Sequence, residues 1–442
     1  ERFDGDSKTW RANCVGLKYD RANRRMTVQS RVYTPEQKER ILRPELCGGA
    51  LLDLGVYCIN FARMFFGSDF ETLNTNCIKG ESGTDMYDTI VLKYADGKIY
   101  FDPGLPECRN FIDKVVRDIV TRYDVDAIHM DDYFYPYPVT GVDFPDDASY
   151  SKYGKGWDKG DWRRNNVDKL IEQLHNTLQE LKPWVQLGIS PFGIWRNKKN
   201  DVNGSETNGL QCYDALYADC PRWTAMGWVD YMVPQLYWEL EHKAASDLTL
   251  SYWWDSRANG RHMYYGQSVN NVMTHRDIAE AKGDTLNPTQ LDHKVRLMRE
   301  LPNVQGPCWW PAYSITNNYK GVMDSLATTH QATPALIQPY TWIDSIAPAQ
   351  VADLKLTKNK TAVTLAWTAP LTTDPLQQAA RYVVYRVKEA EEFNFDDSSA
   401  IYTITGETTL TIPVAKKDKT KWKYAVTAVD RCNNESTPAF IK

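Results

Sequence analysis

Residues 102–343 alternate between short apolar strands and amphipathic helices, and this alternation constrains the fold more than any other feature of the sequence. Helices are predicted at 107–123 and 166–181, where apolar side chains recur at the spacing of a helical stripe. The predicted strands are residues 125–132, 184–190, 228–239, 261–267 and 304–310. Strands joined by helical or loop crossovers form a parallel sheet, so we predict an α/β fold built on part of a (β/α)8 TIM-type barrel.

The segment from residue 347 to the C-terminus predicts a different, all-β fold. Short strands of alternating apolar and polar residues are separated there by turn residues. These strands are residues 351–356, 362–367, 381–386, 409–412 and 422–429. Such spacing is typical of a β-sandwich. The segment carries no evident catalytic constellation, so we expect it to be a spacer or contact module.

The first 101 residues do not continue the alternation of strands and helices. They contain one strong helical pattern at 48–67, then a predicted strand at 89–94 and a turn at 95–97. These are not three further βα units, so we expect the barrel to lack three strands, and a barrel cannot close on the remaining five without leaving open edges. Three explanations remain: the sequence is a mosaic, which we favour; the N-terminal piece closes the sheet in an unusual way; or the chain is a fragment that needs a partner.

Composition narrows the class of function. A net charge of −5 over 442 residues, without a cluster of Lys and Arg, argues against nucleic acid as the main partner. There is no apolar run near 18 residues, so no membrane span is predicted. The nine Cys form no CxxC pair and have no spacing typical of zinc, and phosphate-loop, HExxH and GxSxG motifs are absent from the sequence. We therefore expect neither a metal nor a cofactor.

Tryptophan is unusually frequent, with 15 residues in the chain, of which 11 lie between Trp157 and Trp310. Aromatic faces stack on sugar rings, so this density suits a carbohydrate cleft. A large barrel also buries aromatic side chains in its core, and the sequence leaves this alternative open.

The ends of two predicted strands carry candidate catalytic carboxylates. In a barrel, catalytic residues gather at the C-terminal ends of strands, whose side chains alternate between the helix layer and the interior. On the strand at 125–132, Ile128 and Met130 take the apolar outer positions, so His129 and Asp131 point inward and Asp132 lies just beyond.

The strand at 228–239 ends in the same way. Gln235, Tyr237 and Glu239 share its inward positions, with the carboxylate last. The other three strands end in Ser190, Gln267 and Trp310, none of which is a carboxylate. Two carboxylates across one barrel mouth suit glycoside hydrolysis, in which one attacks or activates water and the other protonates the leaving oxygen.

We assign Asp131 as nucleophile or base and Glu239 as acid, with Asp132 as a further catalytic candidate. The candidate substrate-binding residues are His129, Tyr133, Trp162, Arg163, Ser190, Phe192, Gln235, Tyr237, Gln267, Trp309 and Trp310. Alternative roles remain open for several of these residues. Asp132 would be a turn or helix-cap residue, and His129 would be a hydrogen-bonded residue of the mouth. Glu239 would pair with Lys243, and Trp309 and Trp310 would be packing residues. The predicted loop 161–166 would cap the helix that follows.

At these residues the sequence resembles the glycosyl-hydrolase-like family 10. The motifs are FDPGLPE at 101–107, DAIHMDDYFYP at 126–136, WRRNN at 162–166, GISPFGIWR at 188–196 and PQLYWE at 234–239. The resemblance runs from about 99 to 343 and implies a TIM-barrel glycoside hydrolase of bacteria, secreted or lipid-anchored; a divisome-associated member acts on peptidoglycan glycan strands stripped of their peptides. Related barrels place the nucleophile on strand 4 and the acid on strand 6, which Asp131 and Glu239 match if residues 99–343 hold strands 4–8.

Two further resemblances concern the flanking segments. Residues 347–442 resemble a fibronectin type III domain, through Trp367, Tyr382, Tyr385, YAVTAVD at 424–430 and NNES at 433–436. Residues 33–98 resemble the C-terminal domain of Gfo/Idh/MocA oxidoreductases, through RPELCGGALLDLGVYCIN at 43–60 and DMYDTIVLKYADG at 85–97. In that family Asp53 and Tyr57 would line a substrate pocket. Here they fit a structural fragment that is separated from the rest of its original fold. The sequence has no GxGxxG, so nicotinamide chemistry is not expected.

The sequence thus predicts three segments: 1–98, 99–343 and 347–442. The first functional hypothesis is an exported O-glycoside hydrolase, periplasmic, lipid-anchored or extracellular, that acts on peptidoglycan glycan or another complex polysaccharide. The second is a non-catalytic glycan-binding protein with an incomplete barrel. The third is an oxidoreductase fragment without its dinucleotide domain, which would require NAD(P) binding.

Overall fold

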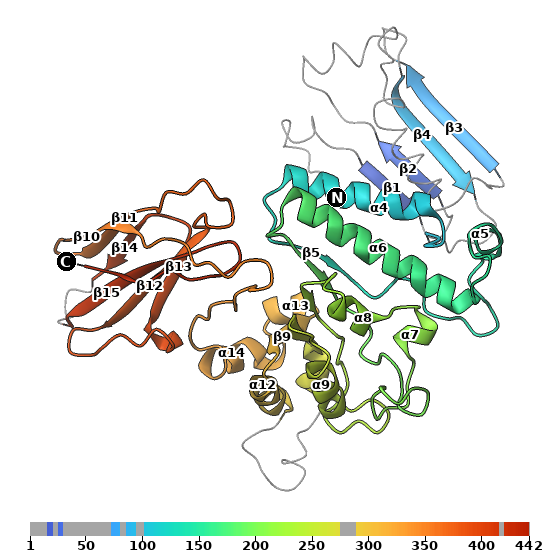
Figure 1. Cartoon of the computed structure of the whole chain (residues 1–442). Coiled ribbons are helices and arrows are strands. Elements are labelled where there is room, and N and C mark those ends of the chain that lie inside the picture. The colour runs from blue at the N-terminus through green and yellow to red at the C-terminus, as the bar shows by residue number, and fades with distance from the viewer. Residues whose placement is uncertain are drawn as a thin grey trace. The chain divides into compact units, whose positions relative to one another are not determined.

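The computed structural model describes residues 16–20, 25–29, 72–79, 85–93, 101–274, 289–414 and 420–441 (Figure 1). The chain divides into two units, Glu1–Asp102 and Pro103–Lys442. In the first unit, β1 (Gly16–Asp20) pairs antiparallel with β2 (Arg25–Gln29), and β3 (Thr72–Lys79) with β4 (Asp85–Lys93). β4 covers most of the predicted strand at 89–94. The predicted helix at 48–67, with Asp53 and Tyr57, and the turn at 95–97 lie outside the described residues.

A five-stranded parallel sheet forms the centre of the second unit. Its strands are β5 (Ala127–Met130), β6 (Gln186–Ile189), β7 (Tyr231–Met232), β8 (His262–Ser268) and β9 (Val304–Trp310), in the order β5-β6-β7-β8-β9. Every neighbouring pair is parallel, so the predicted parallel sheet is confirmed. In the described residues the sheet ends at β5 and β9, and closure into a complete barrel stays a prediction.

β7 is much shorter than the predicted strand at 228–239. Pro234 interrupts the ladder after Met232, because proline has no backbone N–H to donate. Gln235 then makes single bridges to Phe192 and to Gly266. The segment after β7 therefore still runs between its neighbours, but without a regular ladder.

Two long helices run side by side over one face of the sheet (Figure 1). They are α4 (Pro106–Arg122) and α6 (Lys159–Leu181), and the side chains of Arg117 and Glu180 form an ion pair between them at 2.9 Å. α6 begins seven residues before the predicted start at 166, because Asp158 caps it. The Asp158 Oδ1 accepts hydrogen bonds from the backbone N–H groups of Gly160 and Asp161. The predicted loop at 161–166 is therefore wrong: these residues lie inside a helix.

Shorter helices lie between the strands of the sheet and after its last strand, β9. They are α5 (Asp147–Tyr153), α7 (Cys212–Ala215), α8 (Cys220–Ala225), α9 (Asp247–Asp255), α10 (Val269–Val272), α12 (Leu291–Glu300), α13 (Ala312–Thr316), η3 (Tyr319–Gly321) and α14 (Val322–Thr328). Among the helices that the structure describes, none is both long and apolar enough to cross a membrane.

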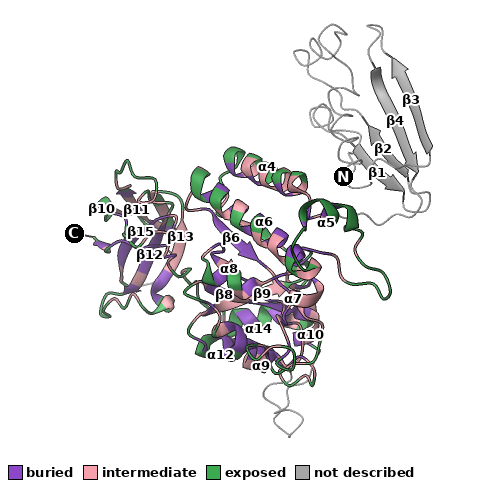
Figure 2. Ribbon diagram, turned by 45° about the vertical axis from the view of Figure 1, so that its right-hand side comes forward, coloured by how far each residue is buried: buried purple, intermediate pink, exposed green. Residues whose placement is uncertain are grey.

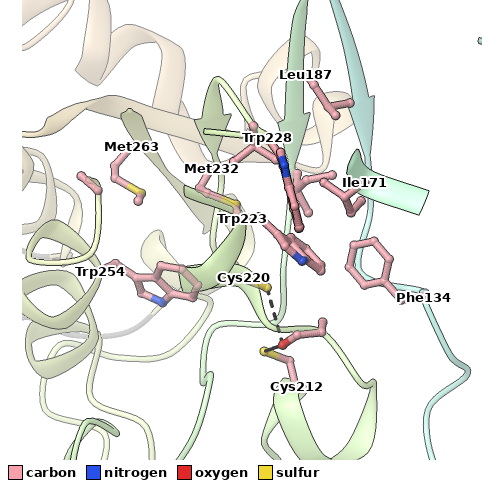
Figure 3. Close-up of a cluster of buried hydrophobic side chains, with 14 of the residues drawn as sticks. Phe134, Ile171, Leu187, Cys212, Cys220, Trp223, Trp228, Met232, Trp254 and Met263 are labelled. Carbon is pink, nitrogen blue, oxygen red and sulfur yellow. Dashed lines mark hydrogen bonds between the residues drawn. The ribbon is translucent and has the colours of Figure 1, made fainter. Parts of the chain in front are cut away.

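The main core lies between the helices and one face of the parallel sheet (Figure 2). Leu187, Ile189, Met232, Met263 and Tyr265 are fully buried on this face, and Ile128 and Met130 pack against the same cluster. Several tryptophans fill the core rather than a cleft: Trp223 and Trp254 are fully buried beside Met232 and Met263 (Figure 3). The outer position predicted for Ile128 and Met130 is thus confirmed.

The C-terminal segment folds into two antiparallel sheets, as predicted. One sheet holds β10 (Ala352–Lys358), β11 (Ala362–Thr368) and β14 (Thr409–Pro413). The other holds β13 (Ile401–Thr405), β12 (Arg381–Lys388), β15 (Trp422–Val429) and β16 (Ala439–Phe440), with η4 (Ser398–Ala400) leading into β13. Trp367 of the first sheet packs on Tyr382 of the second, their ring centroids 5.5 Å apart, within one shared core. The resemblance to fibronectin type III stays a prediction.

Candidate functional site

Asp131 lies at the carboxyl end of β5, exposed on the face of the sheet opposite the main core. Its Oδ1 accepts hydrogen bonds from Gln235 Nε2 at 2.8 Å and from the backbone N–H of Asp132 at 2.9 Å. The same Gln235 nitrogen donates to the carbonyl oxygen of Ser190 at 3.1 Å. One amide group thus joins the ends of three neighbouring strands and orients the Asp131 carboxylate.

His129 and Ser190 share this face with Asp131. The His129 Nε2 lies 2.9 Å from Ser190 Oγ, and its Nδ1 lies 3.1 Å from the hydroxyl of Tyr231. The imidazole also stacks on the Tyr231 ring, with centroids 5.6 Å apart. Both ring nitrogens are therefore engaged, as expected for a hydrogen-bonded histidine of the mouth, and the imidazole is held in one orientation.

Asp132 is buried, only 2% exposed, whereas its neighbour Asp131 is exposed. Its Oδ2 accepts a hydrogen bond from the Tyr137 hydroxyl, and it does not cap a described helix. Burial raises the pKa of Asp132 to about 6, although the Tyr137 hydrogen bond opposes the rise. Asp132 therefore lies buried next to Asp131 and does not face solvent.

Aromatic side chains form a rim near these groups. Trp310 is 55% exposed and stacks on Tyr237, with ring centroids 5.5 Å apart and planes 19° apart. Tyr133 is 67% exposed. Phe192 contacts Tyr137 edge to face. Trp310 and Tyr133 thus expose more than half of their surface, whereas Trp309 packs against the apolar cluster around Val269 and Val272.

The structure places Trp162 and Arg163 away from this rim, inside α6. Trp162 is 2% exposed and packs on Tyr150. Arg163 is 3% exposed and donates to both carboxylate oxygens of Asp146, at 2.7 and 2.6 Å, and to those of Asp143, at 2.9 and 3.1 Å. Both side chains are occupied in packing and ion pairing, because the helix includes the residues expected to form a loop.

Gln267 also lies elsewhere than expected. It shares the outer positions of β8 with Met263 and Tyr265, so it is fully buried on the helix side of the sheet. Its Nε2 donates to Asp247 Oδ2 at 2.9 Å, and its Oε1 accepts from Lys294 Nζ at 2.9 Å. Because Gln267 lies at the end of a strand, we expected its side chain at the barrel mouth. Side chains alternate along the strand, however, and this position directs Gln267 toward the helices instead.

Lys294 completes a buried polar network beside the segment that carries Glu239. Its Nζ donates to Asp247 Oδ2 at 2.7 Å and to the Trp238 carbonyl at 2.6 Å, and both charged side chains are at most 2% exposed. The backbone N–H of Asp247 donates to the Glu239 carbonyl at 3.1 Å. The network therefore fixes the backbone on both sides of the Glu239 side chain, which is half-buried. The proposed pairing of Glu239 with Lys243 stays a prediction.

Sequence reasoning missed three supporting residues: Tyr137, Asp247 and Lys294. Tyr137 is five residues from Asp132 in an aromatic run, which could have marked it as a partner. Asp247 and Lys294 are 47 residues apart, and only the tertiary fold joins them. Among the described residues, no group of three His, Cys, Asp or Glu side chains could hold a metal ion.

Comparisons with known proteins bear on this site. The family model described as Glycosyl hydrolase-like 10 matches residues 81–281, which include Asp131, Gln235 and Glu239. This part of the chain is similar to glycosyl hydrolases. The resemblance to that family is thereby confirmed, and so is the resemblance of the N-terminal segment, because residues 23–101 match the GFO/IDH/MocA C-terminal domain.

Two relatives of this chain are named as glycosyl hydrolases. The chain is 36% identical over 344 residues to Glycosyl hydrolase YngK of Bacillus subtilis (strain 168), over 77% of this chain and 66% of that protein. It is 41% identical over 164 residues to Glycosyl hydrolase DigH of Escherichia coli (strain K12), over 37% of each chain. The chain therefore spans less than two thirds of either relative. The PgaB (BpsB) glycoside hydrolase domain from Bordetella bronchiseptica aligns at a TM-score of 0.35 and 11% identity, over 53% of this chain and 65% of that one.

Proposed function

We propose that this chain is an O-glycoside hydrolase that acts on a bacterial cell-wall glycan or another complex glycan. One observation carries the proposal: Asp131 is an exposed carboxylate at the end of β5, held by Gln235 from the segment after β7. A carboxylate oriented by two hydrogen bonds keeps its remaining lone pairs free for a substrate. We propose an exported location as well, since the polymer lies outside the cytoplasm.

The proposed mechanism uses Asp131 and Glu239. Glu239 donates its proton to the glycosidic oxygen while the bond from that oxygen to the anomeric carbon breaks. Asp131 either attacks the anomeric carbon, forming a glycosyl ester that water then hydrolyses, or removes a proton from the attacking water. A separation of about 5–5.5 Å between the carboxyl groups would favour the first route, and about 6.5–9.5 Å the second.

Glu239→Gln tests the acid. The amide cannot donate a proton as an acid, so kcat for a glycan is expected to fall roughly 100-fold or more. Substrates with an acidic leaving group need less protonation, and we expect an aryl glycoside to lose much less activity. Glu241→Gln is the control, since it removes a neighbouring carboxylate on the same segment. Unchanged release of reducing ends by Glu239→Gln would show that Glu239 is not the acid.

Trp310→Ala tests the aromatic rim. Removing a stacking platform is expected to raise KM for an oligosaccharide about 5–20-fold, a loss of roughly 1–2 kcal/mol, with kcat nearly unchanged. Trp157 is 48% exposed and lies just before α6, so Trp157→Ala is a matched control. Initial rates over a range of oligosaccharide concentrations give both constants. Equal KM values for Trp310→Ala and the unaltered protein would exclude a sugar platform there.

A second candidate function is glycan binding without catalysis. It is favoured by the edges of the parallel sheet, which in the described residues lie at β5 and β9. It predicts saturable binding of a glycan with no new reducing ends. Incubating the full chain with peptidoglycan glycan strands and measuring both binding and reducing ends separates the two functions.

A further inference from the structure

Tyr137 connects the aromatic rim to the carboxylates behind it. Its hydroxyl donates to Asp132 Oδ2, and its ring meets Tyr133 edge to face with centroids 5.7 Å apart. On another side the same ring meets Phe192, with centroids 6.2 Å apart. The phenol is therefore held by aromatic contacts while its polar end reaches a buried carboxyl group.

Asp132 in turn acts on Asp131. The two residues are consecutive, and the backbone N–H of Asp132 donates to Asp131 Oδ1 at 2.9 Å. Their side chains differ in exposure: Asp131 is exposed and Asp132 is 2% exposed. A movement of Asp132, or a change in its charge, therefore affects the Asp131 carboxylate, which is the group proposed to attack the substrate.

The charge of Asp132 changes near neutral pH. Burial raises its pKa to about 6, while the Tyr137 hydrogen bond lowers the pKa by stabilising the carboxylate. The Asp131 charge adds to the rise in the pKa of Asp132, and Tyr237 lies close to both carboxylates, because both raise its pKa beyond the effect of burial. As pH rises through about 6, Asp132 becomes negative, and its charge then lies next to the Asp131 carboxylate.

We propose that Tyr137 is a positioning residue for the proposed hydrolysis: its hydrogen bond holds Asp132 in the ionised form, and Asp132 in turn orients Asp131. This inference rests on the proposed function. It assigns Tyr137 no contact with the reacting atoms.

The test is the pH dependence of kcat for Tyr137→Phe in the full chain. In the unaltered protein, kcat is expected to rise with pH through an inflection near 6, as Asp132 ionises. Without the phenol hydrogen bond the pKa of Asp132 rises further, and a bond of about 1.4 kcal/mol corresponds to a shift of about one pH unit. Near pH 6, Tyr137→Phe should lose about fivefold in kcat, recover by about pH 8 and keep its KM.

Tyr265→Phe is the matched control, because it removes a buried phenol that bonds the Ser251 carbonyl on the helix side of the sheet. It should lower stability without moving the pH profile. The positioning role would be overturned if Tyr137→Phe kept the pH profile of kcat of the unaltered protein. It would also be overturned if the loss of kcat in Tyr137→Phe were not restored at high pH.

A second readout does not depend on activity. Carbon NMR of protein labelled at the aspartate carboxyl groups, with Asp132→Asn to assign the signal, follows the ionisation of Asp132 directly. We expect its midpoint to move upward in Tyr137→Phe and to stay in place in Tyr265→Phe. If the unaltered chain cleaves no glycan, the proposed function fails, and the NMR midpoints still decide whether Tyr137 holds Asp132. An unchanged midpoint in Tyr137→Phe would overturn the inference by itself.

Discussion

Asp131→Asn is expected to lower kcat for glycan cleavage by roughly 10³-fold or more. Asparagine has nearly the same shape, and its side-chain oxygen can still accept the hydrogen bonds from Gln235 and from the Asp132 backbone. The amide has no negative charge, so it neither attacks the anomeric carbon nor removes a proton from water. KM and the unfolding transition should change little, because Asp131 is exposed.

The control uses the other end of the same strand. Asp126 is an exposed carboxylate that directly precedes β5, so Asp126→Asn removes the same charge at the amino end of the strand. We expect this variant to cleave glycan at the rate of the unaltered protein. Reducing-end release over time measures both variants. Full activity in Asp131→Asn would remove Asp131 from the mechanism, whereas equal losses in both variants would indicate a general effect of charge.

Lys294→Met should cause the largest loss of stability, about 3–5 kcal/mol in the free energy of unfolding. The substitution leaves the Asp247 carboxylate buried without its ammonium partner, and it removes the donors to the Trp238 and Gln267 oxygens. Because this network fixes the backbone beside Glu239, glycan cleavage is expected to fall as well. Eleven of the 15 Trp lie between Trp157 and Trp310, so tryptophan fluorescence during urea unfolding reports mainly on this part of the chain.

A double substitution separates the buried charge from the lost packing. Lys294→Met combined with Asp247→Asn leaves no unpaired charge in the core, and we expect it to recover a large part of the stability. Lys169→Met, at an exposed position of α6, serves as the control for losing a lysine. A double variant no more stable than Lys294→Met alone would show that packing, rather than the charge of Asp247, accounts for the loss.

Local patterns in the sequence predicted the elements on which the site is built. Alternation along 125–132 separated Ile128 and Met130, which pack against the core, from His129 and Asp131, which lie on the opposite face. The prediction failed for Gln267. It was assigned to the barrel mouth because it is the last residue of its strand, although its place in the alternation directs its side chain toward the helices. The prediction also failed for 161–166, because the cap at Asp158 was not recognised and the helix starts there.

The abundance of tryptophan shows a different limit. A count of residues cannot separate a stacked sugar platform from a core side chain, because both need the same aromatic surface. Trp223 and Trp254 are fully buried, whereas Trp310 keeps more than half of its surface exposed. Exposure depends on which elements cover a side chain, and this is a property of the packed molecule.

Short stretches of sequence were enough to predict the parallel sheet, the all-β C-terminal segment, the kinship with glycosyl hydrolases and the face on which Asp131 lies. These features depend on periodicity and on motifs within short stretches of chain. Only the packing of the folded chain brings Gln235 to Asp131 across 104 positions, buries Lys294 against Asp247 and places the Tyr137 hydroxyl on Asp132. Hydrogen bonds between distant residues leave no local pattern, because their geometry arises only when separate strands and helices pack together.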